Sequence, residues 1–228
     1  MNNYMLSLLQ LCDSAFPTGA FSHSFGLETY IQEDIIHNKE TLSKWIEAYI
    51  IEQLVYTDGL ACRLTYEALE DNRLEDIWKL DQMLRAQILA QESREGSRRI
   101  GERLLILGTQ LYPSLPLSAY MERVNDSKCN SHPAIAFAII AHCLNIPKSI
   151  ATSSFLLSSI TGLIQNAVRG IPLGQTEGQL LIKESQCLIT KAWNEIEKLT
   201  EEDFGITSPG LEISQMRHEG LHFRIFMS

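Results

Sequence analysis

Residues 129–168 read CNSHPAIAFAIIAHCLNIPKSIATSSFLLSSITGLIQNAV, and Lys148 is the only Lys, Arg, Asp or Glu in this run. A run this apolar belongs either to a membrane or to the interior of a soluble protein. Pro147 divides it, and the second half carries nine Ser, Thr, Gln and Asn side chains, which a lipid-facing helix does not favour. We therefore expect two helices buried in a soluble core and no membrane association.

Apolar residues continue at helical spacing on both sides of this run, and no segment alternates as a strand would. The pattern predicts helices at about residues 4–12, 22–32, 41–54, 60–69, 74–84, 93–111, 133–144, 147–169 and 172–196. Asp58 is expected to cap the fourth of them. Residues 1–205 are therefore predicted to form one all-α domain, a helical bundle. The helical pattern is lost from about Glu201, and residues 206–228 are expected to form an extended tail.

The composition counts against several classes of protein. The 228 residues carry 28 acidic and 19 basic side chains, a net charge of −9, which argues against nucleic-acid binding because that activity needs a basic surface. The five cysteines are odd in number and scattered, and no secretory signal segment is evident. We therefore expect a cytoplasmic protein without disulfide bonds.

One short motif matches an enzyme signature. Residues 218–222 read HEGLH, the H-E-x-x-H pattern of zinc proteases, in which His218 and His222 would bind zinc and Glu219 would activate water. Gly220 lowers the stability of a helix here by about 1 kcal/mol relative to Ala. Only six residues follow His222, so a downstream third ligand is nearly excluded. A zinc metalloprotease stays open as an alternative.

Two other sets of residues lack the spacing that their chemistry needs. Four Cys and His residues do not match zinc-finger spacing and fit buried core positions better: Cys129, His132, His142 and Cys143. Residues 170–176 resemble a phosphate-binding loop only loosely, because Gln175 stands where the loop needs Lys. We therefore expect no bound metal, no nucleotide and no other cofactor.

Five Arg and no Lys lie between residues 85 and 103. The pairs Glu95–Arg99 and Arg98–Glu102 can form along one helix, which makes a solvated helix face the ordinary interpretation. Guanidinium groups also bind carboxylates in a bidentate manner, so the same helix is suited to gripping the carboxylates of a neighbouring protein. Both interpretations stay open.

The tail is unusually apolar for the end of a chain, where segments tend to fray. Its apolar positions fit no single helical face, and charged side chains interrupt them: Pro209, Leu211, Ile213, Met216, Leu221, Phe223, Ile225 and Phe226, with Arg217, His218, Glu219 and Arg224 between. Such a segment either packs on its own domain or docks on a partner protein. The residues alone do not decide between these alternatives.

Three stretches carry a more specific pattern. Residues 9–28 read LQLCDSAFPTGAFSHSFGLE, residues 166–179 read NAVRGIPLGQTEGQ, and residues 208–219 read SPGLEISQMRHE. The first is similar to an opening helix followed by a P-x-G-x-[FY] turn and S-x-G-L-E. The others resemble an A-V-R-x-x-P-L-G-Q-T-x-[GA]-Q run and an S-P-x-L-D-I-x-x-M-R-H-E tail. Together these patterns resemble the UreF family of urease accessory proteins.

The resemblance implies an all-α, dimeric and non-catalytic chaperone. Proteins of this family bind the accessory protein UreD (also called UreH) and the GTPase UreG, and the assembly delivers nickel to apo-urease. The tail would then order against UreD/UreH, and the absence of a phosphate loop fits a chain that leaves GTP hydrolysis to UreG. A GTPase-activating protein that supplies Arg94 or Arg98 to UreG is an alternative.

The resemblance also points to two groups of contact residues. The tail group is expected to meet UreD/UreH and consists of Leu211, Ile213, Met216, Arg217, His218, Glu219, Phe223 and Arg224. The second group matches family positions and serves either partner contact or fold support: Phe16, Pro17, Thr18, Gly19, Ser22, His23, Glu28, Arg169, Gly174 and Gln175. Its Pro and Gly residues would set the turns.

Overall fold

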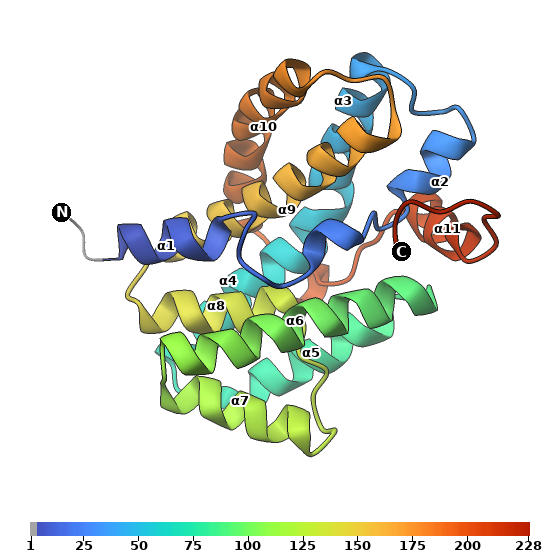
Figure 1. The fold of residues 1–228 in the computed structure, drawn as a ribbon. Helices are drawn as coiled ribbons and strands as arrows, with labels where there is room; N and C mark the ends of the chain where they lie inside the picture. Colours follow the sequence, from blue (N-terminus) through green and yellow to red (C-terminus); the bar gives the residue numbers. More distant parts are fainter. Residues whose placement is uncertain (1–3) are drawn as a thin grey trace.

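Figure 1 shows the computed structural model of the chain, which describes residues 4–228. Every regular element in this part of the chain is helical and none is a strand, which confirms the all-α prediction. In chain order the elements are α1 (Met5–Cys12), the 3-10 turn η1 (Ala20–Ser22), α2 (Leu27–Gln32), α3 (Lys39–Ala48), the π-helical segment η2 (Tyr49–Gly59), α4 (Leu60–Glu70), α5 (Leu74–Gln87), α6 (Gln91–Leu111), α7 (Leu115–Asn125), α8 (Pro133–Cys143), α9 (Lys148–Gly170), α10 (Gln175–Ile196), the 3-10 turn η3 (Glu201–Asp203) and α11 (Pro209–His218).

Helix α8 is the centre of the core. All its residues from Ala134 to Ala141 are buried, and it packs against α4, α6, α7 and α9. A helix that is apolar on every side has to be buried, and its alanines leave room for neighbouring helices to come close. Pro133 is its first residue, where the missing backbone N–H leaves no bond unmade. The expected pair of core helices, α8 and α9, is confirmed.

The helices form two layers. In the view of Figure 1, α3, α9 and α10 lie in the upper half and α5, α6, α7 and α8 in the lower half. Helix α4 connects the layers because it packs against both α8 and α9. Within residues 4–228, no helix combines the length and the apolar character that crossing a membrane requires.

The chain from Lys39 to Glu70 is one continuous helical stretch, which corrects the prediction of two helices separated by a cap. Helix α3 passes directly into η2, and η2 passes into α4 with helical backbone angles at the junction. Asp58 therefore lies inside η2 and caps no helix. The wider π-helical turns are uncommon and often mark functional sites, and this one lines the interior cavity described below.

Helix α2 is shorter than predicted, and α7 was not predicted. The chain around Ser22 forms only a 3-10 turn, and α2 begins at Leu27 after Gly26 in the left-handed conformation. Helix α7 follows α6 closely and contains a proline in its first turn. Because proline is also typical of loops, the sequence of this segment does not distinguish a helix from a loop.

Helix α11 lies in the tail, so the prediction that residues beyond about 201 lose helical structure is wrong for this segment. Its buried positions are Leu211, Ser214 and His218, whereas Ile213 and Met216 are exposed. Apolar spacing therefore does not mark the buried face of α11, because two of its three buried residues are polar and hydrogen-bonded.

Candidate functional site

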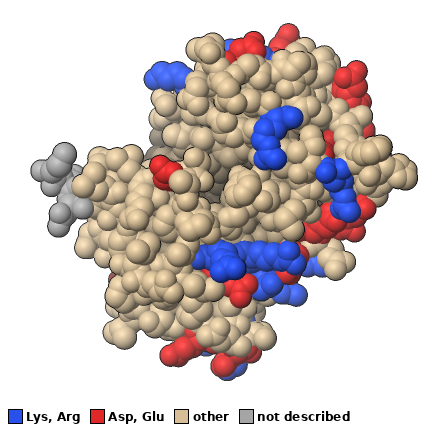
Figure 2. Space-filling view, viewed as in Figure 1, with Lys and Arg blue, Asp and Glu red and all other residues tan. Residues whose placement is uncertain are grey.

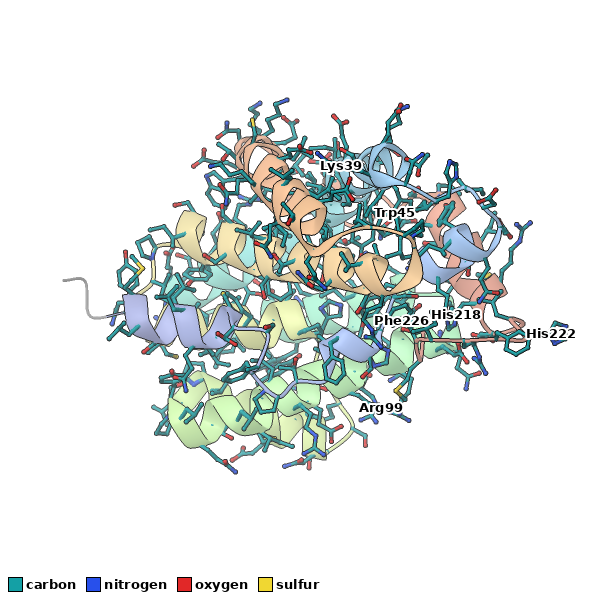
Figure 3. All side chains as sticks on the ribbon, turned by 45° about the horizontal axis from the view of Figure 1, so that its top comes forward. Lys39, Trp45, Arg99, His218, His222 and Phe226 are labelled. Carbon is teal, nitrogen blue, oxygen red and sulfur yellow. The ribbon has the colours of Figure 1, made fainter. Side chains whose placement is uncertain are left out.

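His218, at the end of α11, joins the tail to the body of the molecule. Its ring is fully buried, with Nε2 at 2.9 Å from Oε2 of Glu28 and Nδ1 at 2.8 Å from Oε2 of Glu92. Because ionised carboxylates only accept hydrogen bonds, the ring donates from both nitrogens and carries a positive charge. Figure 3 shows His218 directed into the body, whereas His222 points away from it.

Glu92 is held by two cations of the tail. Besides His218, Nη1 of Arg224 lies 2.6 Å from its Oε1. Burial raises the pKa of Glu92, but the hydrogen bonds from His218 and Arg224 outweigh burial and hold the pKa below its usual value. The tail is thus attached to the first turn of α6, where a carboxylate is also favoured by the helix dipole.

Glu28 holds the last residues of the chain. Its Oε1 accepts a hydrogen bond from the backbone N–H of Ile225 at 2.6 Å, and its Oε2 accepts one from Phe226 at 3.1 Å. The Phe226 ring is buried, and the guanidinium of Arg169 lies 5.0 Å from its centroid. Three sequence-predicted site residues, Glu28, Arg169 and His218, therefore meet at one place although they are far apart in sequence.

The segment before α2 binds Ser228. The Ser228 carbonyl oxygen accepts hydrogen bonds from the backbone N–H groups of Ser24 at 2.6 Å and Phe25 at 3.0 Å. His23 Nδ1 lies 2.9 Å from the Ser228 hydroxyl. Burial, and then the positive charges of Arg99 and His218, lower the pKa of His23, which favours the neutral imidazole. Phe25 and Gly26 have positive φ angles, so the chain turns sharply between these donors and the start of α2.

Close packing of α11 explains Gly26. A Cβ at this position would lie 2.5 Å from the Ser214 hydroxyl oxygen and 3.3 Å from the Gln215 backbone nitrogen. Thr29 donates a hydrogen bond to the Ser214 carbonyl at 2.7 Å across the same contact. The S-x-G-L-E pattern at residues 24–28 is therefore the receptor for the tail.

The opposite face of the tail is exposed and apolar. We call it the tail strip; it consists of Ile213, Met216, Phe223, Ile225 and Met227, with exposed fractions of 49%, 43%, 85%, 55% and 53%. The sequence left self-packing and partner docking open, and the structure contains a self-packed inner face alongside this free outer face. Because the inner face fixes the backbone of the tail, the tail strip can bind a partner with little further loss of backbone conformational entropy.

The remaining predicted tail residues lie at its edges. Leu211 is buried and faces the interior cavity, and Glu219 accepts a hydrogen bond from the Gln91 backbone N–H at 3.0 Å. Arg217 pairs with Glu33 at 3.1 Å on the surface. The tail group thus divides into inner anchors and outer side chains.

The second predicted group is only partly brought to the tail. His23 and Ser22 contact its last residues, the latter through its carbonyl and the Met227 N–H at 2.8 Å. Phe16, Pro17, Thr18 and Gly19 form the turn between α1 and η1, in which Gly19 has φ of +81° and Phe16 packs on the core. Gly174 caps α10 through Glu177, and Gln175 is exposed beside it. Within residues 4–228, neither Gly174 nor Gln175 makes a hydrogen bond to the tail.

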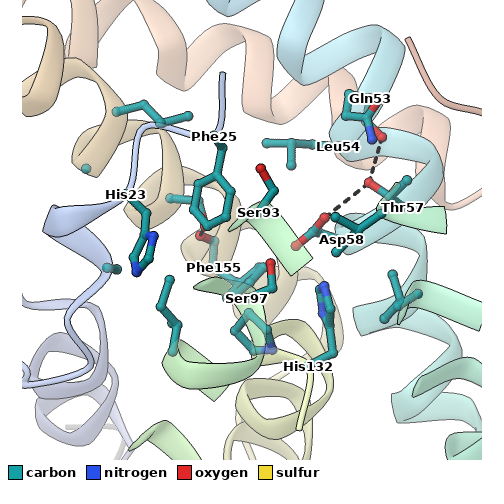
Figure 4. Close-up of a pocket in the computed structure, with 18 of the residues that line it drawn as sticks. His23, Phe25, Gln53, Leu54, Thr57, Asp58, Ser93, Ser97, His132 and Phe155 are labelled. Atoms are coloured by element: carbon teal, nitrogen blue, oxygen red, sulfur yellow. Dashed lines mark hydrogen bonds between the residues drawn. The ribbon is translucent and has the colours of Figure 1, made fainter. Parts of the chain in front are cut away.

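An interior cavity of about 200 Å³ lies behind α11, and Leu211 forms part of its wall (Figure 4). Its walls are mostly apolar, with His23, Asp58 and His132 among the polar exceptions. The Thr57 hydroxyl donates to the Gln53 carbonyl at 2.9 Å and lies 3.1 Å from Asp58 Oδ2. Two polar atoms in the wall, the Ser93 hydroxyl and the Gln87 amide oxygen, have no hydrogen-bond partner among the described residues.

The zinc-protease alternative does not fit this geometry. Both His218 nitrogens are bonded to carboxylates, and α11 ends at His218, so His222 is not on the same helix face. No group of three or more His, Cys, Asp or Glu that could hold a metal ion occurs within residues 4–228.

The looser Cys and His set is also dispersed. His132 caps α8 through Nδ1, and Cys143 lies 3.0 Å from the Ser114 hydroxyl. His142 packs edge-on against Tyr66, with ring centroids 5.4 Å apart. Cys129 and His132 are buried as predicted, whereas His142 and Cys143 are only half-buried.

Glu92, which receives both His218 and Arg224, is not among the residues predicted from the sequence. A single acidic residue in the first turn of a predicted helix gives no signal of its own, because such residues are common there. Its role follows only from the approach of the tail, more than a hundred residues later.

Comparison with known proteins identifies relatives of this chain. The model of the UreF family matches residues 36–186. The urease accessory protein UreF of Lachnoclostridium phytofermentans is 71% identical over 228 residues, which cover the whole of both chains. UreF of Bacillus sp. strain TB-90 is 50% identical over 226 residues, covering 99% of this chain and all of the relative.

Proposed function

The chain belongs to the UreF family of urease accessory proteins, and we propose that it works by joining UreD/UreH to the GTPase UreG during insertion of nickel into apo-urease. Family membership makes it a non-catalytic accessory protein of urease maturation. The proposal concerns which proteins it joins and through which residues. Nickel is the cargo of this process, and the chain is proposed to organise its carriers rather than to store it.

The tail strip is the observation that carries this proposal. Five apolar side chains on an anchored backbone form a surface that water solvates poorly. Fully burying one such side chain contributes about 1.5–3 kcal/mol, so burying several would offset the entropic cost of association. We assign this strip to UreD/UreH, with Arg217 and Glu219 at its edge setting the register.

UreG is proposed to bind elsewhere on the same chain. Pro17 and Gln175 are exposed members of the second predicted group, and neither is needed to hold the tail. The buried members His23 and Glu28 serve the fold, because their polar atoms are used in attaching the tail. Binding both partners would raise the effective concentration of each for the other and make metal transfer intramolecular.

A second copy of the chain is proposed to bind at α1, giving a homodimer. Met5, Leu6 and Leu9 are exposed on α1, with exposed fractions of 43%, 70% and 61%. Tyr112 donates a hydrogen bond to Gln10 at 2.8 Å, which places the exposed Leu115 at the same edge of the molecule. Leu6→Glu is expected to convert a dimer into a monomer in light scattering without loss of helical content.

The test of the bridging function uses Phe223→Glu, because Phe223 is 85% exposed and its side chain supports nothing in the fold. This variant should bind purified UreD/UreH at least about tenfold more weakly and should fail to activate urease in cells. Leu180→Glu makes the same kind of change on α10, at a side chain that is 50% exposed, and this control variant should behave as the unmodified chain. Normal UreD/UreH binding by the Phe223 variant would show that the tail strip is not part of the interface.

A further inference from the structure

A basic groove lies along the first turns of α6. It runs between the end of α5, the first turns of α6 and residues 127–131, and its cations are Arg85, Arg94, Arg98 and Lys128. No Asp or Glu of the described chain lines it. Figure 2 shows basic side chains gathered in a band over α6, on a chain whose net charge is −9.

Two of these cations have no carboxylate partner within residues 4–228. Arg85 donates to the Asn130 side-chain oxygen at 2.5 Å, and Arg94 donates to the carbonyls of Ile88 at 2.9 Å and Leu89 at 3.1 Å. A guanidinium has five N–H donors, so most of the donors of both groups remain available. Their positive charge is therefore not neutralised inside the molecule.

The groove is also held in shape. Arg98 is fixed by Glu95 at 2.7 Å and Glu102 at 2.9 Å, and Arg94 is fixed by its two carbonyls. Arginine side chains that are already oriented lose less rotamer freedom when they bind a ligand. The groove shares Arg85, Arg94, Arg98 and Asn130 with a second hollow, where the buried Asp81 is fully occupied by Tyr120, Asn130 and His132.

We infer that this groove receives an extended, carboxylate-rich polypeptide segment of a partner protein. Guanidinium groups match carboxylates in bidentate geometry, and Ala86 and Val124 provide an apolar lining for the aliphatic part of a peptide. A nucleic acid needs several phosphate contacts, whereas only two cations of this groove, Arg85 and Arg94, lack a carboxylate partner among the described residues. The backbone N–H groups of Gln91 and Glu92, which would strengthen a phosphate site at the start of α6, are already bound by Glu219.

The groove adjoins the surface on which the tail is anchored. Glu92 holds the tail on the first turn of α6, and Arg94 lies two residues further along the same helix. A protein seated on the tail strip would therefore have the groove within reach of a neighbouring acidic segment. This inference deepens the proposed bridging function and rests on it for the identity of the partner, but peptide binding to the groove can be measured alone.

The test compares two charge-reversal variants of the full chain. Arg85→Glu combined with Lys128→Glu reverses two groove cations, and Arg103→Glu combined with Lys191→Glu makes the same change in net charge at exposed positions outside the groove. Fluorescein-labelled hexaglutamate is the probe, measured by anisotropy, with hexaglutamine and hexathymidylate as comparison ligands. Circular dichroism confirms that each variant is folded.

The unmodified chain should bind hexaglutamate and not hexaglutamine, with an affinity that falls as salt rises from about 50 to about 200 mM. The groove variant should bind at least about tenfold more weakly, and the control variant within about twofold of the unmodified chain. Equal loss in both variants, no binding of hexaglutamate, or tighter binding of hexathymidylate would each overturn the inference. Phe223→Glu should bind hexaglutamate normally, so failure of the tail strip and failure of the groove are separate results.

Discussion

His218 carries a positive charge at a position with no solvent exposure, and two carboxylates make this tolerable. The arrangement is a buried ion pair extended to three groups, and its members depend on one another. A buried pair contributes little net stability compared with apolar residues of the same shape, but removal of one partner leaves an uncompensated charge. The expected role of this triad is therefore to specify how the tail docks, rather than to add much stability.

Glu28→Gln tests that role. The amide nitrogen would face either the Ile225 N–H or the two donors His218 and Phe226. In both orientations the imidazolium is short of a counter-charge, and loss of a buried partner costs about 3–5 kcal/mol. We expect the tail to detach locally, seen as faster hydrogen exchange at residues 225 and 226. Glu33→Gln, which breaks only the surface pair with Arg217, should leave that exchange unchanged.

The second residue-scale prediction concerns pH. Burial lowers the pKa of His132, whose Nδ1 accepts the Ala134 N–H and so must be unprotonated there. A histidine whose pKa is lowered by folding contributes stability above its unfolded pKa near 6.5, and this stability is lost as pH falls. At pH 5.5 the loss reaches about 1.4 kcal/mol for a histidine that stays neutral in the folded state.

His132→Asn keeps a helix-capping acceptor and removes the titration. Urea unfolding at pH 7.5 and 5.5 should therefore show a smaller loss of stability for this variant than for the unmodified chain. The variant should still lose some stability on acidification, because the pKa of His23 is lowered as well. Identical pH dependence in the two proteins would mean that His132 is not buried in its neutral form.

At the scale of elements, the contact between α6 and the loop before α8 leaves no room for a side chain. A Cβ on Gly101 would lie 1.4 Å from the Ser131 carbonyl oxygen, which belongs to the backbone and cannot rotate away. Ser131 also donates to the Arg98 carbonyl at 3.0 Å, so the loop is fastened to α6 at this level. The same contact sets the walls of the basic groove.

Gly101→Ala should therefore destabilise the protein by several kcal/mol, or prevent folding, because the loop has to move away from α6. Gly162→Ala on α9 is the control, since a Cβ there meets nothing within 4 Å. Replacing glycine by alanine inside a helix favours the helix by about 1 kcal/mol, so this variant should be slightly more stable. Thermal unfolding of both variants tests whether Gly101→Ala lowers the stability and Gly162→Ala raises it.

The same elements show how far sequence patterns reach. Helices α8 and α9 were predictable because one is apolar throughout and the other follows a proline that can only begin a helix. The pairs Glu95–Arg99 and Arg98–Glu102 were predictable from spacing and are present. Helix α11 was not, because its buried face contains Ser214 and His218, whose burial depends on partners elsewhere in the chain.

At the scale of the whole molecule, the tail brings together segments that the sequence leaves far apart. Glu28 at the start of α2, Glu92 at the start of α6 and Arg169 at the end of α9 all contact residues 218–226. Family-like patterns near residues 28, 169 and 218 mark these positions, but no spacing rule indicates that they meet. Glu92 carries no such mark, so the complete site is visible only in the folded chain.

Removal of residues 206–228 tests this assembly. The truncated chain would lose the buried side chains Leu211 and Phe226, each worth about 1.5–3 kcal/mol, and would leave Glu28 and Glu92 without their cations. Helical content should fall only by the share of α11, while the melting temperature should drop by about 2–4 °C for each kcal/mol lost. Urease activation should be abolished.

Phe223→Glu separates the two contributions of the tail, because it should abolish activation while leaving the melting temperature unchanged. If the truncated chain instead melted at the original temperature, the inner anchors would add nothing to the free chain, and the tail would be ordered only by its partner. The entropic cost of ordering the tail backbone would then lower the affinity for UreD/UreH. Variants that stiffen residues 219–224 would therefore bind UreD/UreH more tightly. A lowered melting temperature would mean that the tail is already ordered when the free chain folds. This result is expected for a tail strip that is preordered before UreD/UreH binds.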